Sequence, residues 1–214
     1  MTLSIIDAIK KLKPDYDKEK ADLMSNELMI AYAGYYRKYH TIKEHISPGL
    51  NLLKEIKDLC ENYPLVQFAW WYHDFYMVPG TPHNENVSAD RAAFDGLNLD
   101  FNSGLIIKIF SLIFATKHEK KNIVVHDDEI IHDLDLYLLG DSPKQYERRQ
   151  TLIRAEYDLF PIETYNKQRI FILDKFLQYK NMFCTEYFQG RFEQQARKNI
   201  KAEINILKSE LEQC

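Results

Sequence analysis

The residues of this chain that could do chemistry are mainly histidines and aspartates. Two of them, His73 and Asp74, directly follow a nearly continuous apolar run from Leu65 to Tyr72, which only Gln67 interrupts. Such a run predicts a helix that is buried on most sides. A lone carboxylate buried at the end of that helix would cost a large amount of free energy. Binding to a metal ion explains the pair most simply.

Other imidazole and carboxylate groups could complete such a site. The candidates in chain order are His40, His45, His73, Asp74, His118, His132, Asp133 and Asp135. Ligands of these two kinds suit a divalent cation, with magnesium, manganese, iron, cobalt, nickel and zinc all compatible. Because adjacent helical residues point about 100° apart, His73 and Asp74 can share one ion most easily at a helix end. The loop after Tyr76, which contains 79–82 (PGTP), supplies that end.

Asp133 and Asp135 compete for one place in the site. They lie two positions apart on one expected helix, so they project to nearly opposite sides and only one should face the ion. The face of Asp135 is otherwise apolar, whereas Asp133 lies beside Glu129. These neighbours favour Asp135 as the inward carboxylate, with Asp133 as the alternative.

Helical spacing of apolar residues dominates the chain, which has only seven glycines and seven prolines as breaks. The expected helices cover 4–11, 17–36, 47–63, 64–74, 84–93, 103–115, 128–139, 143–157, 161–177 and 192–211. Gly140 directly follows the expected helix at 128–139 and is expected to end it. We therefore predict an all-α fold with one domain over 1–214, in which a core of about 17–140 is followed by C-terminal helices over 142–214.

Composition excludes several classes of protein. The net charge is only −4 and its signs are interspersed, so the chain lacks the basic surface of a nucleic-acid binder. The cysteines (Cys60, Cys184 and Cys214) form no CxxC pair, which indicates a reducing compartment. No signal peptide is apparent, and the most apolar segment, 105–115, is too short to span a membrane. We expect a soluble cytoplasmic protein with no membrane or nucleic-acid partner; a homo-oligomer stays open.

The order of these residues resembles the HD superfamily of metal-dependent phosphohydrolases, and in particular a bacterial branch of predicted phosphohydrolases. The matching segments are 37–40 (RKYH), 45–46 (HI), 71–76 (WYHDFY), 84–89 (NENVSA), 116–118 (TKH), 133–140 (DLDLYLLG), 153–157 (IRAEY) and 196–200 (ARKNI). They cover most of the chain in the right order. A single His-Asp pair would be weak support, whereas this ordered set is specific.

The resemblance implies a ligand set of His45, His73, Asp74 and Asp135 for one divalent metal ion. It also implies that His40 protonates the leaving group, a role for which histidine has a suitable pKa. Relatives usually place these two histidines four positions apart, whereas His40 and His45 are five apart. A loop before the next helix could absorb the extra residue, or the extra residue could misplace His40.

Three further side chains are candidates for the site, each with an ordinary structural alternative. Glu85 could orient a water molecule at the metal, or it could be a carboxylate that stabilises a helix N-terminus. Arg37 could bind a phosphate through its planar guanidinium, or it could be solvent-exposed. His118 could face the substrate, or it could be a histidine that favours a helix C-terminus.

The other residues that the sequence singles out have ordinary structural explanations. Arg154 and Arg197 could each form a structural ion pair. His132 has no clear role and is expected to face solvent. Trp70 and Trp71 are expected to lie in the core.

These observations lead to a functional hypothesis with two alternatives. The leading hypothesis is hydrolysis of a phosphate ester, from a nucleotide or another small phosphorylated metabolite, by water activated at the metal. Asp74 would also orient that water if a second ion binds. The first alternative is a metal-stabilised helical module that binds a nucleotide as a regulatory signal without turnover. The second is a purely structural helical scaffold with no metal.

Overall fold

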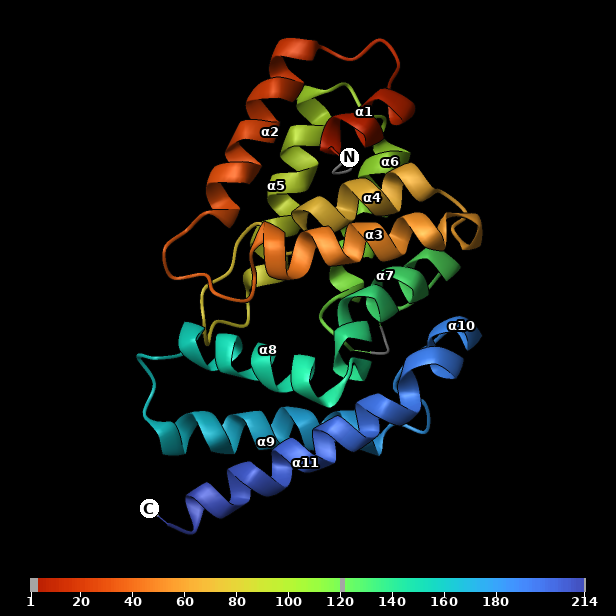
Figure 1. Ribbon diagram of the computed structural model, residues 1–214. Coiled ribbons are helices and arrows are strands. Elements are labelled where there is room, and N and C mark those ends of the chain that lie inside the picture. Colours follow the sequence, from red (N-terminus) through yellow and green to blue (C-terminus); the bar gives the residue numbers. More distant parts are fainter. Residues whose placement is uncertain (1–3, 120–121, 214) are drawn as a thin grey trace. The chain divides into compact units, whose positions relative to one another are not determined.

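A computed structural model describes residues 4–119 and 122–213, and every regular element within these ranges is a helix (Figure 1). The predicted all-α fold is confirmed. The chain divides into two compact units, Met1–Leu134 and Asp135–Cys214. The division falls inside helix α7, between Leu134 and Asp135. Among the described residues, no helix has both the length and the apolar character needed to cross a membrane.

The first unit is built around helix α4. Its elements are α1 (Ile5–Leu12), α2 (Lys18–Tyr32), a π-helical turn (Ile42–Ile46), α3 (Ser47–Glu55), a 3-10 turn (Lys57–Leu59), α4 (Tyr63–Tyr72), α5 (Asn84–Asn98), α6 (Ser103–Ala115) and most of α7 (His126–Leu136). Helices α1, α3, α5 and α6 all pack against α4 (Figure 1). We expected the core to begin near residue 17, but Ile5 and Ile9 on α1 are also fully buried.

The sequence explains why α4 forms and why it is central. The side-chain oxygen of Asn62 accepts a hydrogen bond from the Leu65 amide, and Pro64 occupies the first turn. All residues from Leu65 to Tyr72 are buried, including Trp70 and Trp71, as predicted. Helix α3 approaches this surface closely, because a Cβ at Gly49 would lie 2.2 Å from the Trp70 ring.

A polar contact also anchors the C-terminal end of α4. The Tyr72 hydroxyl donates a 2.8 Å hydrogen bond to Asp95 on α5, and Arg91 donates to the same carboxylate oxygen at 2.7 Å. Asp95 is buried. A buried carboxylate is tolerated when it is paired and hydrogen-bonded in this way. The residues that follow Tyr72 are therefore held at a defined position beside α5.

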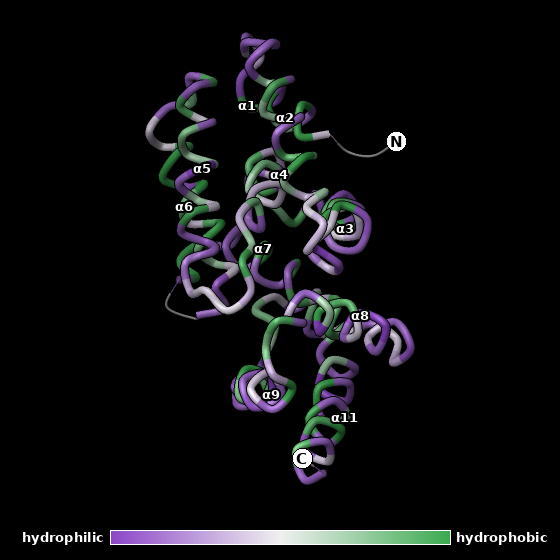
Figure 2. The backbone as a smooth tube through the Cα atoms, turned by 90° about the vertical axis from the view of Figure 1, so that its left-hand side faces the viewer, coloured by the Kyte–Doolittle hydropathy of each residue, from purple (hydrophilic) through white to green (hydrophobic). Residues whose placement is uncertain are grey.

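The second unit contains a 3-10 turn (Tyr137–Gly140), α8 (Pro143–Glu156), α9 (Ile162–Gln178), the short α10 (Glu186–Phe188), a π-helical turn (Gln189–Glu193) and α11 (Gln194–Leu211). Helix α11 packs against α9 and against the 3-10 turn. Hydrophilic and hydrophobic residues alternate along α11 in Figure 2, as expected for a helix with one buried face. Cys60 and Cys184 are free thiols, and Cys214 lies outside the described residues.

Several predicted boundaries differ from the observed ones. Helix α2 ends at Tyr32 instead of residue 36, and α5 runs on to Asn98 instead of stopping at 93. Gly140 does not adopt the left-handed conformation expected after a helix. It is required for another reason, because a Cβ there would lie 2.7 Å from Phe192. Close packing by a distant segment cannot be deduced from local spacing.

Candidate metal centre

The His73 side chain is oriented by the helix that carries it. His73 caps the C-terminus of α4, and its ring stacks on the Trp70 ring with centroids 4.2 Å apart. Its Nδ1 lies 2.8 Å from the Trp70 carbonyl oxygen, which can only accept a hydrogen bond. The neutral ring therefore carries its proton on Nδ1, and the lone pair of Nε2 is left to bind another group. Metal-binding histidines are commonly oriented by a second hydrogen bond of this kind.

His45 faces His73 across the centre. The Nε2 atoms of His45 and His73 lie 3.0 Å apart, and both residues are 1% exposed. The His45 ring lies between Tyr39 and Trp70, with centroids 5.1 Å from each. Since Nε2 of His73 is the acceptor, the proton between the two rings belongs to His45. A cation bound at this point would replace that proton.

The extra residue between His40 and His45 is accommodated by a π-helical turn. The Ile46 amide donates to the Thr41 carbonyl at 3.1 Å, a hydrogen bond that spans five residues. The Thr41 side chain caps the turn by accepting from the Glu44 amide. A π-turn is a one-residue expansion of an α-helix and occurs often at functional sites. The sequence left open whether a loop absorbs this residue or His40 is misplaced; in the structure a π-helical turn, which continues directly into α3, absorbs it.

Asp74 supplies an oxygen to the same centre. Its Oδ2 lies 3.1 Å from His73 Nε2 and 3.4 Å from His45 Nε2. Burial by itself would raise the pKa of the Asp74 carboxyl. When the rings are protonated, charge on His73 and His40, with hydrogen bonds from His45 and His73, holds this pKa well below its usual value. Asp74 therefore carries a negative charge across the physiological pH range.

The spacing of these donor atoms matches a metal coordination sphere. Ligand atoms about 2.1 Å from an ion and at right angles to one another lie about 3.0 Å apart. Asp135 completes the group, because one ligand atom from each of His45, His73, Asp74 and Asp135 lies within 4.8 Å of the others. Asp135 is the first residue of the second unit, and it lies on α7, whose residues up to Leu134 belong to the first unit. Two imidazole nitrogens and two carboxylate oxygens suit a divalent cation.

The predicted ligand residues are thus brought together, whereas two of their neighbours on α7 differ from expectation. We expected His132 to face solvent and Asp133 to be the outward carboxylate, but these residues are 1% and 0% exposed. The Nδ1 atom of His132 lies 3.0 Å from Asp133 Oδ1. Helix α7 is buried on more than one side, so the outward face that the sequence implied does not exist.

His40 lies next to the centre but outside the group of donor atoms. Its ring centroid is 5.8 Å from that of His45, and the residue is partly exposed. Its charge contributes to the lowered pKa of Asp74, which shows that the two groups are close. His40 is therefore accessible from solvent and near the carboxylate, as a proton donor must be.

Arg37 has a different position from the expected one. Its guanidinium donates hydrogen bonds to the backbone carbonyls of His40, Asp74 and Phe75, at 3.2, 2.8 and 2.7 Å. The residue is 4% exposed, and its guanidinium also lies over the Tyr32 ring. Little of the guanidinium is left to bind a phosphate. These contacts assign Arg37 the role of joining the His40 segment to the His73–Asp74 segment.

Replacing Arg37 with lysine should therefore lower stability and metal affinity together. Lysine keeps the charge but cannot span three carbonyl groups, and a buried polar group without a partner costs about 1–3 kcal/mol. We expect urea unfolding to show a loss of roughly 1–3 kcal/mol and calorimetry to show weaker metal binding. The control is Lys38→Arg, at a neighbouring exposed position, where no change is expected. Unchanged stability in Arg37→Lys would contradict the assigned role.

Glu85 and His118 also lie near the centre. Burial raises the pKa of the Glu85 carboxyl, and the negative charge of Asp74 raises it further, while Lys117 and His118 oppose the shift. His118 has a positive φ of 55° just after α6, an uncommon conformation outside glycine. Its ring lies 5.2 Å from that of His132. Both residues thus belong to the surroundings of the metal group, and their functional roles stay predictions.

One residue of this region was missed by the sequence reasoning. Lys117 donates a 2.6 Å hydrogen bond from its ammonium group to the side-chain oxygen of Asn86 on α5, and it is close enough to Glu85 to influence its pKa. It is partly exposed. A lysine ammonium beside a metal group could bind a phosphate as a point charge. Its sequence signal was its place in the matching segment 116–118 (TKH), next to His118.

Two arginines of the matching segments lie in the second unit and have structural roles. Arg154 donates to the carbonyls of Tyr157 and Phe160 at the end of α8. Arg197 pairs with Glu193 and donates to the Leu177, Tyr179 and Lys180 carbonyls. The ion pair that we considered is therefore present for Arg197, while Arg154 binds backbone oxygens.

Searches with this chain matched no protein-family model, no curated protein and no solved structure. The description of this chain as a candidate metal-binding protein therefore rests on its fold and its side chains alone. The chain is an all-α protein with a group of histidine and aspartate residues that could hold a divalent metal ion.

Proposed function

We propose that this chain is a metal-dependent phosphohydrolase of the HD type that acts on a small phosphorylated metabolite, such as a nucleotide. The observation that carries the proposal is the convergence of His45 Nε2, His73 Nε2 and Asp74 Oδ2 within 3.0–3.4 Å of one another. A bound divalent cation would lower the pKa of a coordinated water molecule and polarise a phosphoryl oxygen. The resemblance of the ordered motifs to HD phosphohydrolases supports the same reaction.

The side chains around the metal group supply the remaining requirements. His45 and His73 are closed off from solvent, whereas the Asp74 side chain is 19% exposed and can be reached from solvent. His40 is partly exposed close to Asp74, so it can donate a proton to the departing alkoxide. Lys117 brings a positive charge to the same region and can attract a phosphate group.

The proposal is tested by a screen for phosphate release over a library of phosphorylated metabolites, with manganese, magnesium, iron, cobalt, nickel or zinc added in turn. We expect release from at least one nucleotide or sugar phosphate, dependent on metal and removed by a chelator. The Asp74→Asn variant should be inactive in the same assay. Metal-independent release, or release that Asp74→Asn retains, would contradict the mechanism.

A second candidate function is a metal-stabilised module that binds a nucleotide without turnover. The specific observation in its favour is that Arg37, one candidate for neutralising charge on a reacting phosphate, is occupied by three backbone carbonyls. Calorimetry with nucleotides, run beside the phosphate-release assay, separates the two. Tight binding with no release at high protein concentration would favour the sensor.

A further inference from the structure

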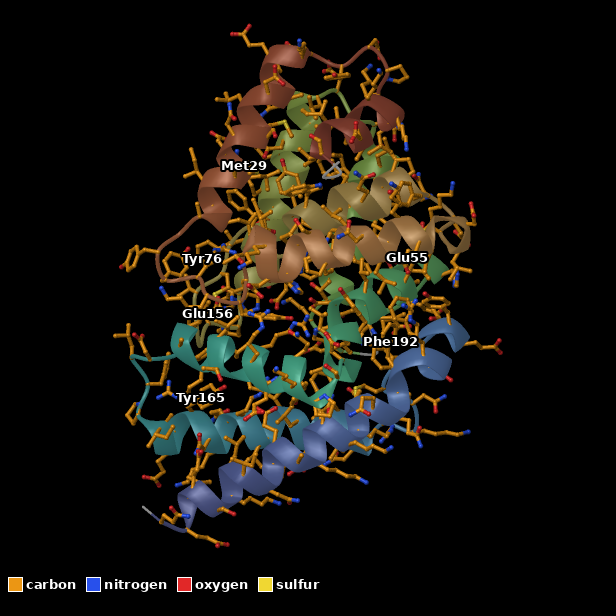
Figure 3. The ribbon with its side chains drawn as sticks, in the orientation of Figure 1. Met29, Glu55, Tyr76, Glu156, Tyr165 and Phe192 are labelled. Atoms are coloured by element: carbon orange, nitrogen blue, oxygen red, sulfur yellow. The ribbon has the colours of Figure 1, made fainter. Side chains whose placement is uncertain are left out.

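A cavity in the second unit is separate from the metal group. It has a volume of about 540 Å³ and is lined by residues of α8, α9 and α11. This volume falls within the range of about 300–1,000 Å³ typical of small-molecule sites. Tyr165 on α9 is one of the lining residues (Figure 3), and the Arg154 guanidinium of α8 lies 4.8 Å from the centre of its ring. The cavity therefore lies within one unit.

One buried polar atom of the lining has no hydrogen-bond partner among the residues that the structure describes. Asn166 is 1% exposed, and its Oδ1 has no hydrogen bond. Its Nδ2 donates to Glu210 Oε2 at 2.8 Å. Because a carboxylate can only accept, the amide nitrogen must face Glu210, and the oxygen is the atom left over. A buried acceptor without a donor costs about 1–3 kcal/mol, so a ligand that supplies a donor would recover part of this free energy.

The other polar groups of the cavity define the charge of the ligand. The lining contains the carboxylates of Glu147, Glu203 and Glu210 but only one cation, Arg154. Both oxygens of Glu203 are already occupied, since they accept from Arg169 and Tyr146. Glu210 and Asn166 Oδ1 are thus the adjacent acceptors that a ligand could use. An ammonium group has three donors and no acceptor, so it matches this pair, and a phosphate does not.

The rest of the lining defines the body of the ligand. Tyr165, Ile162, Ile206 and Leu207 present apolar or aromatic surface to the cavity. An aromatic or aliphatic group bound against them would be removed from water, which is favourable in proportion to the apolar area buried. The Asn166 oxygen is buried. A donor group of the ligand can therefore reach it only if the neighbouring side chains move slightly.

We propose that the cavity between α8, α9 and α11 is a binding site for a small organic amine with an apolar body, in which Asn166 Oδ1 and Glu210 bind the ammonium group. The site is independent of the proposed hydrolysis and needs no metal ion. It gives the C-terminal helices a function of their own, as a place where a cationic metabolite binds.

Calorimetry on the full chain without added metal tests the proposal, with 2-phenylethylamine, 2-phenylethanol and phenyl phosphate as probes. We expect the amine to bind at least about tenfold more tightly than the alcohol, with phenyl phosphate weakest. Equal binding of amine and alcohol, tighter binding of the phosphate, or no binding at millimolar probe would overturn the proposal.

Two variants and a control locate the site. Glu210→Gln, at an exposed position, should weaken the amine by roughly tenfold and leave the alcohol unchanged, because it removes the charge that pairs with the ammonium. Asn166→Leu should weaken the amine by a similar factor. Glu212→Gln is the matched control, since Glu212 follows α11 and does not line the cavity. Amine affinity that is unchanged in both Glu210→Gln and Asn166→Leu would place binding elsewhere.

Discussion

The Asp74→Asn variant is expected to lose divalent-metal binding and phosphate release together while keeping its fold. Asparagine has nearly the same shape as aspartate, and the Asp74 backbone carbonyl that binds Arg37 is unaffected. The change removes the negative charge of one candidate metal ligand, whose Oδ2 lies 3.1 Å from His73 Nε2 and 3.4 Å from His45 Nε2. We expect metal affinity to fall by roughly 100-fold or more.

A variant of a second candidate metal ligand, His73, should also lose metal binding and phosphate release. His73→Ala removes the Nε2 donor, although it also removes the ring that stacks on Trp70. Some loss of stability is therefore expected for His73→Ala, which is why Asp74→Asn is the cleaner test. Metal binding is measured by calorimetry and by elemental analysis of protein purified without chelator. Circular dichroism of each variant confirms that helices are retained.

The matched control for both variants is His83→Ala. His83 is exposed and its side chain makes no capping hydrogen bond at the start of α5. The His83→Ala variant should bind metal and release phosphate at the wild-type level.

The metal affinity of the wild-type protein should fall as the pH is lowered, because protons compete with the cation for the imidazole nitrogens. Full phosphate release by metal-free Asp74→Asn would rule out the proposed chemistry.

The second large effect is expected in the other unit, where Arg169→Met should strongly destabilise the fold. Arg169 on α9 donates to both oxygens of Glu203 on α11, at 2.8 and 3.3 Å. Tyr146 on α8 donates to Glu203 as well, so one carboxylate joins three helices. Burial raises the pKa of the Tyr146 hydroxyl, and the negative charge of Glu203 raises it further. Removing the arginine leaves a carboxylate buried without its counter-charge.

Breaking a buried ion pair by removing one partner typically costs about 3–5 kcal/mol. We expect a loss of this size in urea unfolding followed by circular dichroism, which reports on the helices of both units. The control is Lys167→Met, which breaks the exposed Lys167–Glu163 pair one turn away. Exposed pairs contribute about 0–1 kcal/mol, so this variant should be nearly unchanged.

A triple variant separates the buried charge from the packing around it. Arg169→Met combined with Glu203→Leu and Tyr146→Phe replaces the whole group by apolar side chains of similar size, and we expect it to recover much of the lost stability. If Arg169→Met and Lys167→Met were equally stable, the three-helix junction would not depend on this ion pair.

Much of the candidate site could be predicted from local sequence. An apolar run that ends in His73-Asp74 places two polar groups at the end of a buried helix, and the structure has α4 end at Tyr72 with His73 as its cap. The apolar neighbours of Asp135 indicated that this carboxylate faces inward, and it joins His45, His73 and Asp74. These inferences succeed because residues on one helix face are related by the regular turn of the helix.

Other features were decided only by the tertiary structure. The burial of His132 and Asp133 depends on segments that cover a second face of α7, and the role of Arg37 depends on carbonyl groups that come 37 and 38 residues later in the chain. The π-helical turn at Ile42–Ile46 depends on where His45 must lie relative to α4. Sequence by itself determined which residues share a helix face. What covers each face depends on contacts between segments far apart in the chain, and those contacts have no local pattern.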